Sequence, residues 1–175
     1  MSTFNNLSFS WPNGTACLRE ISGTLSAPLT GLIGDNGSGK STLLKLMLGT
    51  YSPTSGSLEV PDNIGYLPQD LGLKTSATIA DVFGITEILD ALAKVEAGEY
   101  SEELLSIIGD DWDVEERTQK YIGKLDVHRT IGTLSGGEAV SVALGAVFAQ
   151  QPDLVLLDEP TNNLEIGRAS CRERV

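Results

Sequence analysis

The chain has 175 residues, of which 41% are hydrophobic and 21% are charged, a composition typical of a globular domain and not of a disordered one. Its net charge of −12 excludes the broad basic surface that nonspecific binding to nucleic acid or to an anionic membrane requires. No apolar run approaches the roughly eighteen residues of a membrane-spanning helix, so no direct membrane insertion is expected.

The first elements expected along the chain are strands. Residues 4–11 alternate roughly between apolar and polar side chains, which predicts a strand, and residues 12–15 (Pro-Asn-Gly-Thr) are typical of a hairpin turn. Residues 17–25 are expected to return as one strand, or as two strands broken near Ser22 and Gly23. The chain is therefore expected to begin with an antiparallel β region.

The stretch from Gly34 to Ser41, called the phosphate loop below, matches the pattern Gly-x-x-x-x-Gly-Lys-Ser/Thr. The apolar run Leu29–Ile33 is predicted to be the strand that enters it, and residues 42–48 the helix that leaves it. Glycines let the backbone turn tightly with its N–H groups facing inward, and the helix N-terminus adds positive potential. We expect these residues to hold the phosphates of a nucleotide: Asn36, Gly37, Ser38, Gly39, Lys40, Ser41 and Thr42.

Two side chains of this segment have specific chemistry. Lys40 can reach the β- and γ-phosphates, and the hydroxyl of Ser41 can be a ligand of Mg²⁺. The alternative is a glycine-rich turn that matches the pattern by chance, and the remaining motifs decide between the two.

Beyond the phosphate loop, residues 57–60 and 63–67 are predicted to be short strands. The character then changes, because residues 79–122 have the periodicity of helices punctuated by glycines. This pattern indicates a small, acidic helical subdomain, at about residues 76–133, inserted into an α/β core.

The segment Leu134–Glu138 (Leu-Ser-Gly-Gly-Glu), called the signature segment below, opens a long apolar helix over residues 139–150. Ser135 and Glu138 fit a capping box, and the exposed N–H groups of Gly136 and Gly137 at a helix start form an anion site. Both interpretations can hold together. We therefore include Ser135, Gly136 and Gly137 among the candidate nucleotide-binding residues.

An apolar strand is predicted within residues 153–160, and it ends in the carboxylates of Asp158 and Glu159. Ligands tend to bind at such strand ends in open α/β sheets. Asp158 can hold Mg²⁺ through water, and Glu159 can orient or deprotonate an attacking water. The alternative is a polar strand end that enters a turn before Pro160.

Together these motifs resemble, over residues 1–165, the nucleotide-binding domain of ATP-binding cassette (ABC) proteins. The resemblance implies a P-loop NTPase of α/β class with a mixed sheet core, an N-terminal antiparallel β subdomain and an inserted helical subdomain. It further implies ATP and Mg²⁺ as ligands, ATPase activity, and a second cassette whose ATP is gripped by the signature segment.

The same resemblance implies two more site residues. Gln69 corresponds to a glutamine that senses the metal and the attacking water, and it joins Glu159 as a catalytic candidate. Trp11 lies where an aromatic ring often stacks on adenine. Trp11 can instead be an aromatic of the core, and Phe9 is the competing candidate for the adenine contact.

The run Pro160–Glu165 is similar to the ABC-F branch, whose members carry two cassettes in one chain, lack a membrane domain and act on ribosomes in translation or antibiotic resistance. The alternative is the ATPase subunit of a membrane transporter with a permease partner. The chain has two cysteines without metal-ligand spacing, so a cytoplasmic protein is the simplest interpretation.

Residues 166–175 change abruptly to arginine-rich sequence and resemble the translation of a common sequencing adapter. We expect them to be a non-native tail that truncates the cassette at its C-terminus; the alternative is a genuine basic tail. In the ABC family, ATP is hydrolysed between the phosphate loop of one cassette and the signature segment of another. We therefore expect this chain by itself to be inactive.

Overall fold

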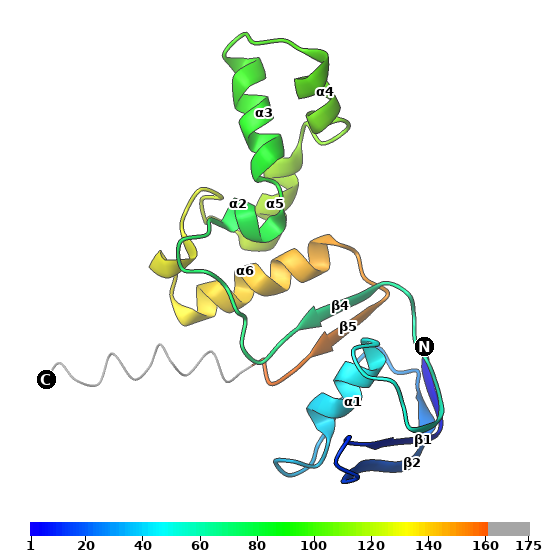
Figure 1. Cartoon of the computed structure of the whole chain (residues 1–175). Helices are drawn as coiled ribbons and strands as arrows, with labels where there is room; N and C mark the ends of the chain where they lie inside the picture. The colour runs from blue at the N-terminus through cyan, green and yellow to red at the C-terminus, as the bar shows by residue number, and fades with distance from the viewer. Residues whose placement is uncertain (161–175) are drawn as a thin grey trace, which may run out of the picture. The chain divides into compact units, whose positions relative to one another are not determined.

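The computed structural model describes residues 1–160, and the predictions made for residues 161–175 lie outside this part of the chain. The described residues divide into two compact units. The first consists of Met1–Tyr66 and Pro152–Asp158, and the second of Leu67–Gln151 with Glu159 and Pro160. Figure 1 traces the first unit in blue and cyan with an orange return strand, and the second mainly in green and yellow.

The first unit begins with the predicted antiparallel sheet. Strand β1 (Ser2–Ser10) lies between β2 (Ala16–Leu25) and β3 (Ser55–Glu59) and is antiparallel to both. The strand β2 is continuous, but its pairing with β1 shifts register opposite residues 21–23, which is where the sequence suggested a break. Phe4, Leu7 and Phe9 of β1 are all buried in one core, and Phe4 and Leu7 can share it although they are three positions apart because the pairing of β1 with β2 shifts register between them.

Helix α1 (Lys40–Met47) follows the phosphate loop as predicted. Its buried side chains are Leu43, Leu44, Leu46 and Met47, and they share one core with the buried residues of β1, β2 and β5. Strand β4 (Ile64–Leu67) pairs with β5 (Leu154–Leu157) in a second, two-stranded sheet, and their arrows run in the same direction (Figure 1).

The prediction of a strand over Leu29–Ile33 is wrong. These residues have no regular structure; Leu29 is 87% exposed and Ile33 fully exposed. An apolar run becomes a strand only when a neighbouring strand pairs with its backbone. Among the described residues, β1 already has a partner on each edge and β4 and β5 pair with each other, so no described strand is paired with this run.

The second unit is built from helices. In chain order they are α2 (Ile79–Phe83), α3 (Thr86–Glu96), α4 (Glu102–Ile108), α5 (Val114–Ile122), a short 3₁₀ turn η1 (Ile131–Thr133) and α6 (Gly136–Ala149). Local sequence sets several boundaries: Thr78 and Asp81 form a capping box on α2, and Gly84 ends that helix with a positive φ of 70°. Ser101 is the N-cap of α4, and its side chain accepts a hydrogen bond from the N–H of Leu104.

The core of the second unit gathers the apolar faces of its helices. Helix α6 packs against α5 and α2, while α3 lies beside α4 (Figure 1). The fully buried members include Ile79, Val127 and Val142. No helix within residues 1–160 is both long enough and apolar enough to cross a membrane.

Candidate functional site

The phosphate loop takes the backbone conformation that its glycines permit. Gly37 and Gly39 have backbone φ values of 84° and 97°, which L-residues with a side chain rarely adopt. Gly39 is the N-cap of α1, and no side chain caps this helix. A Cβ atom on Gly39 would lie 2.7 Å from Cδ2 of Leu18, so the loop also needs glycine here for space. The N–H groups at the start of α1 therefore remain available to a ligand.

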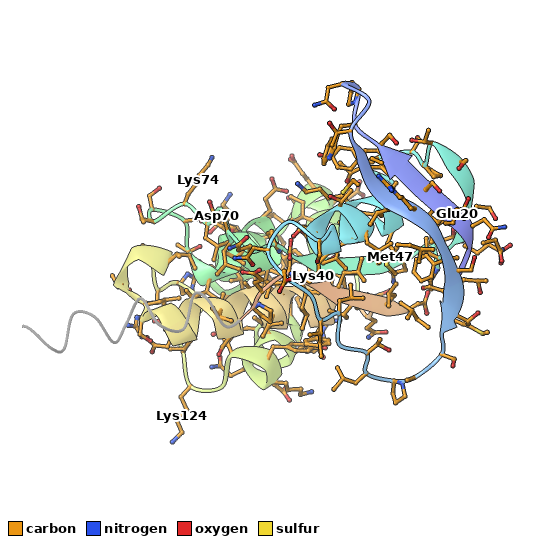
Figure 2. The ribbon with its side chains drawn as sticks, turned by 90° about the horizontal axis from the view of Figure 1, so that it is seen from below. Glu20, Lys40, Met47, Asp70, Lys74 and Lys124 are labelled. Atoms are coloured by element: carbon orange, nitrogen blue, oxygen red, sulfur yellow. The ribbon has the colours of Figure 1, made fainter. Side chains whose placement is uncertain are left out.

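Lys40 lies at the N-terminal end of α1, with Met47 at the other end (Figure 2). Its ammonium group folds back over the loop and donates hydrogen bonds to the carbonyl oxygens of Gly34 at 2.7 Å and Asp35 at 3.0 Å. Both acceptors are neutral carbonyl groups, so the positive charge of Lys40 has no carboxylate partner within these bonds. A phosphate group is a stronger acceptor for an ammonium ion than a carbonyl oxygen.

The two predicted metal ligands of the first unit meet directly. The hydroxyl of Ser41 donates a hydrogen bond of 3.0 Å to Oδ1 of Asp158, although the residues are 117 positions apart in the chain. Asp158 follows β5, and it is only 7% exposed. A buried carboxylate needs such a partner, because leaving it unpaired away from water is costly.

A third residue of this group, Tyr66, was missed by the sequence analysis. It lies in β4, next to β5 in the two-stranded sheet, and its hydroxyl interacts with the Asp158 carboxylate. Burial raises the pKa of Tyr66 above its ordinary value, and the charge of Asp158 and the hydrogen bond to it raise it further. Tyr66 is therefore a neutral donor beside Asp158. The only sequence signal was a polar tip in an otherwise apolar strand.

Glu159 and Gln69 belong to the second unit, whereas Ser41 and Asp158 belong to the first. Glu159 has a φ of 49°, which is unusual for a residue with a side chain. Backbone strain of this kind concentrates at functional sites. Gln69 is exposed in the segment that follows β4. The structure thus brings Ser41 and Asp158 together, whereas the two catalytic candidates, Gln69 and Glu159, belong to the other unit.

Trp11 belongs to an aromatic cluster at the end of the β1–β2 hairpin. Its ring lies edge-on to Phe9, with 5.1 Å between centroids, and edge-on to Tyr51 at 5.5 Å. Phe9 and Tyr51 stack face to face at 5.4 Å. Phe9 is buried, while Trp11 is half-buried and keeps part of its ring accessible. Of the two aromatic candidates, only Trp11 is placed to offer a ring to a ligand.

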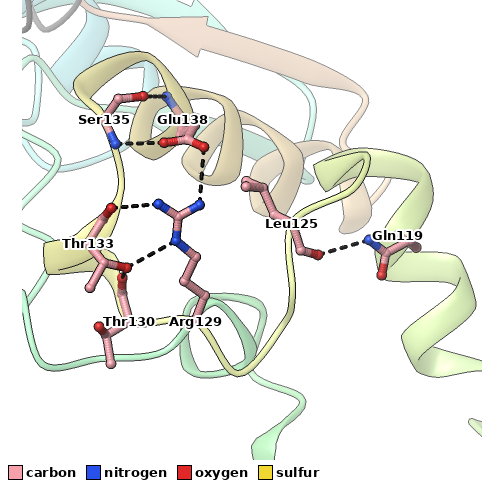
Figure 3. A network of polar contacts seen from close by, with 7 residues as sticks. All are labelled: Gln119, Leu125, Arg129, Thr130, Thr133, Ser135 and Glu138. Carbon is pink, nitrogen blue, oxygen red and sulfur yellow. Dashed lines mark hydrogen bonds and ion pairs between the residues drawn. The ribbon is translucent and has the colours of Figure 1, made fainter.

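The signature segment begins helix α6 with a complete capping box (Figure 3). The N–H of Glu138 donates to Oγ of Ser135 at 3.3 Å, and the N–H of Ser135 donates to Oε2 of Glu138 at 2.7 Å. The first N–H groups of a helix have no acceptor inside it. Since the capping box satisfies Glu138 and Ser135, the N–H groups left at this helix start are those of Gly136 and Gly137.

Arg129, which the sequence analysis also missed, contacts the same capping box. Its guanidinium donates to Oε1 of Glu138 at 3.2 Å and, through two other nitrogens, to Oγ1 of Thr133 at 3.1 Å and the Thr133 carbonyl at 2.6 Å. The pKa of Glu138 is lowered, chiefly by its hydrogen bonds with Ser135 and in addition by Arg129. No motif marks an arginine at this distance before the signature segment.

A family model described as ABC transporter matches residues 18–162. The chain belongs to this family. The family consists of ABC ATPase domains, and the observed combination of an antiparallel β region, a phosphate loop with its helix and a helical unit agrees with the cassette fold. The fold class predicted from the sequence is confirmed.

Relatives of the chain include proteins of different roles. The chain is 37% identical over 163 residues to the tylosin resistance ATP-binding protein TlrC of Streptomyces fradiae, a match of 77% of this chain and 30% of TlrC. It is 34% identical over 165 residues to the zinc import ATP-binding protein ZnuC of Rickettsia prowazekii, covering 93% of this chain and 64% of ZnuC. It is 33% identical over 168 residues to the energy-dependent translational throttle protein EttA of Escherichia coli, covering 82% and 30%.

The chain therefore spans between 30% and 64% of the length of these relatives. Among solved structures, a metal-chelate type ABC transporter in an inward-facing conformation superposes with a TM-score of 0.67 over 97% of this chain and 66% of that one. The sequence identity of this pair is 24%, so the likeness concerns the fold alone.

Proposed function

We propose that this chain is a nucleotide-binding cassette that binds ATP together with Mg²⁺, and that the intact protein hydrolyses ATP. The observation that supports this most is the 3.0 Å hydrogen bond between Ser41 and Asp158. This bond joins Ser41, at the end of the phosphate loop, to the carboxylate that follows β5. Ser41 lies in the first turn of α1, where Lys40 and the N–H groups of the loop also lie. Phosphate binding and metal binding therefore converge on one helix terminus.

The residues present fit a magnesium ion. Ser41 and Asp158 offer a hydroxyl and a carboxylate, the hard oxygen donors that Mg²⁺ prefers. Residues 1–160 contain no cluster of three or more His, Cys, Asp or Glu side chains that would form an all-protein metal cage. Mg²⁺ is usually held by one or two protein groups plus substrate phosphates, and when bound it neutralises charge on the phosphates. We assign Ser41 and Asp158 as its protein ligands and Gln69 as an additional one.

We assign the remaining roles residue by residue. Lys40 leaves its two carbonyl acceptors and takes the phosphates instead, together with the loop from Asn36 to Thr42. Trp11 stacks on adenine. Glu159 orients the attacking water and accepts its proton, while Gln69 senses water and metal.

The signature segment acts on the ATP of a second cassette, through Ser135, Gly136 and Gly137. This division of labour makes each cassette half of two sites. The 175-residue chain by itself is therefore expected to bind ATP weakly and to turn over negligibly. Measurable steady-state hydrolysis by the purified monomeric chain would contradict this part of the proposal.

For the biological role we propose an ABC-F protein that couples hydrolysis to remodelling of a ribosomal or translation complex. The similarity to TlrC and EttA, whose names refer to antibiotic resistance and translation, supports it. The second candidate is the ATPase subunit of a membrane transporter, and the similarity to ZnuC supports it about equally. Both candidates place the cassette in the cytoplasm.

The first experiment measures MgATP binding by isothermal titration calorimetry. Lys40→Ala is expected to weaken binding at least tenfold, because a charge-assisted contact to phosphate is lost. Lys45→Ala is the matched control: Lys45 is on the same helix, with its ammonium 5.9 Å from the centre of the Tyr51 ring, and its loss should change binding less than about twofold. Equal affinities for Lys40→Ala and the wild type would refute the phosphate-loop assignment.

The second experiment separates the two biological roles. The source DNA is read again past the codon for Leu164, across the segment that we propose to be non-native (residues 166–175). A frame that continues through a charged linker into a second cassette favours the ABC-F role. A frame that closes after one cassette beside a permease gene favours the transporter, and a native arginine-rich tail removes the truncation proposal.

A further inference from the structure

We propose that Arg129 is a positioning residue for the signature segment: its guanidinium fixes the Glu138 carboxylate in the capping box and offsets its negative charge beside the N–H groups of Gly136 and Gly137. This inference rests on the proposed function, since it concerns how the signature segment meets a phosphate. It assigns to Arg129 a role in the closed, two-cassette state, and no role in the binding of ATP to the phosphate loop of its own cassette.

The backbone of Arg129 is anchored on both sides. Its carbonyl accepts the N–H of Ile79 at 3.0 Å, and the neighbouring Val127 carbonyl accepts the N–H of Ala80 at 2.8 Å. Thr78 and Thr130 form an isolated antiparallel bridge. Val127 is 1% exposed. The segment that carries Arg129 is thus held against the start of α2, and its side chain projects from a fixed point.

From that point the guanidinium spans two neighbouring parts of the chain. Two of its nitrogens hold Thr133, at the carbonyl and at Oγ1, and the third holds Glu138 (Figure 3). The Thr133 hydroxyl in turn donates to the Thr130 carbonyl at 2.7 Å. A planar guanidinium suits this task, because its donors have a fixed fork geometry that a lysine cannot reproduce. The network therefore fixes the turn that leads directly into the signature segment.

The charge of Glu138 gives the network a second purpose. Its carboxylate is bonded to the Ser135 N–H, so it sits at the first turn of α6, beside the N–H groups that remain for an anion. A carboxylate there favours the helix but repels an incoming phosphate. Arg129 makes the pair neutral. Arg129 and Glu138 are each 36% exposed at the side chain, so solvent only partly screens the charge.

A purely structural arginine and a charge-compensating one differ in a double-mutant cycle. The intact protein that carries this chain with its second cassette is assayed as wild type, Arg129→Gln, Glu138→Gln and the double variant. We expect Arg129→Gln to lower kcat roughly tenfold with KM for ATP changed less than about twofold, because Glu138 is left unpaired at the signature segment. Glu138→Gln keeps an oxygen acceptor for Ser135, so its kcat should stay within about threefold of the wild type.

The double variant decides between the two roles. Charge compensation predicts that it recovers to within about threefold of the wild-type kcat, because the charge that Arg129 offsets is gone. A double variant as slow as Arg129→Gln, or an unchanged kcat in Arg129→Gln, overturns the proposal. Arg117→Gln is the matched control: Arg117 pairs with Asp111 and Asp113 elsewhere in the second unit and should leave kcat unchanged.

A second measurement tests the role of Arg129 even if the wild-type protein does not hydrolyse ATP. Absence of hydrolysis would contradict the proposed function but not the inference about Arg129. In the 175-residue chain, the amide resonance of Ser135 is followed by NMR as a function of pH, since this N–H is bonded to the Glu138 carboxylate. Arg129→Gln should move the midpoint of this titration upward and speed hydrogen exchange of the Ser135 amide. Arg117→Gln should do neither. A midpoint and an exchange rate that Arg129→Gln leaves unchanged would show that Arg129 does not act through Glu138.

Discussion

Helix α1 of the first unit and helix α6 of the second present the N–H groups at their starts by opposite means. Helix α1 begins at Gly39 with no side-chain cap, and its nearby cation, Lys40, is bonded to carbonyl groups of its own loop. Helix α6 begins at Ser135 with a full capping box, and its nearby cation, Arg129, is bonded to the capping carboxylate.

This difference separates a site that must rearrange from one that is preorganised. At α1 the backbone N–H groups are available to a ligand, but the ammonium group of Lys40 is hydrogen-bonded to two carbonyl groups of the loop. Ligand binding therefore exchanges these carbonyl acceptors of Lys40 for phosphate oxygens. At α6 the side chains satisfy Ser135 and Glu138 themselves and leave only Gly136 and Gly137 for a ligand. Glycines with positive φ therefore shape the start of α1, whereas a side-chain capping box shapes the start of α6.

The largest expected effect is that of Gly39→Ala in the first unit. The φ of 97° and the Cβ position 2.7 Å from Cδ2 of Leu18 combine backbone strain with a steric clash. We therefore expect Gly39→Ala to lower the free energy of unfolding by about 2–4 kcal/mol and also to abolish MgATP binding. Urea unfolding and calorimetry measure the two. Gly49→Ala is the control, because its φ of 71° brings strain without any neighbour within 4 Å. It should cost only about 1 kcal/mol and leave binding intact. Similar losses for both variants would mean that the close packing against Leu18 is irrelevant.

A smaller effect is expected at α6 from Ser135→Ala. Loss of the N-cap oxygen removes the bond from the Glu138 N–H and should cost about 1 kcal/mol of unfolding free energy. Thr78→Ala removes the equivalent oxygen from the capping box of α2, so it should destabilise by a similar amount. Only Ser135→Ala should also lower kcat of the intact protein. If Thr78→Ala lowers kcat as much, the effect reflects general stability and not the signature segment.

The contrast between the two helix starts also explains what the sequence could predict. The phosphate loop and the capping box are local patterns, in which spacing alone dictates the backbone, so the start of α1 and the bonds between Ser135 and Glu138 follow from the sequence. The contact of Ser41 with Asp158 spans 117 positions, and the sequence indicated both residues as metal ligands without showing that they touch.

The failures were all tertiary. The run Leu29–Ile33 has the composition of a strand, yet strand formation depends on a pairing partner that no composition reveals. Tyr66 and Arg129 act through single long side chains whose direction is set by packing, Tyr66 from β4 toward Asp158 and Arg129 from an anchored turn toward Glu138. No spacing rule connects such residues with the motifs that they support.

The smallest expected effect sharpens the comparison through pH. Tyr66 in the first unit has a pKa raised mainly by burial, so this tyrosine holds its proton more tightly in the folded protein than in the unfolded chain. Its contribution to stability is present below the ordinary pKa of tyrosine and is lost as the pH rises through the raised value. Glu138 in the second unit has a pKa lowered mainly by the Ser135 backbone bond, so its contribution is present above the ordinary pKa of glutamate and is lost as the pH falls through the lowered value.

Denaturant unfolding at a series of pH values measures both limbs. Tyr66→Phe should flatten only the alkaline limb, and Glu138→Gln should flatten part of the acid limb. The acid limb keeps the contribution of Asp81, whose pKa is lowered by its hydrogen bonds to Thr86 and Thr78. An alkaline limb that Tyr66→Phe leaves unchanged, or an acid limb that it flattens, would contradict the assignment of the alkaline limb to Tyr66. The expected separation, with Tyr66 of the first unit acting only at high pH and Glu138 of the second unit only at low pH, follows from the opposite directions of their two pKa shifts.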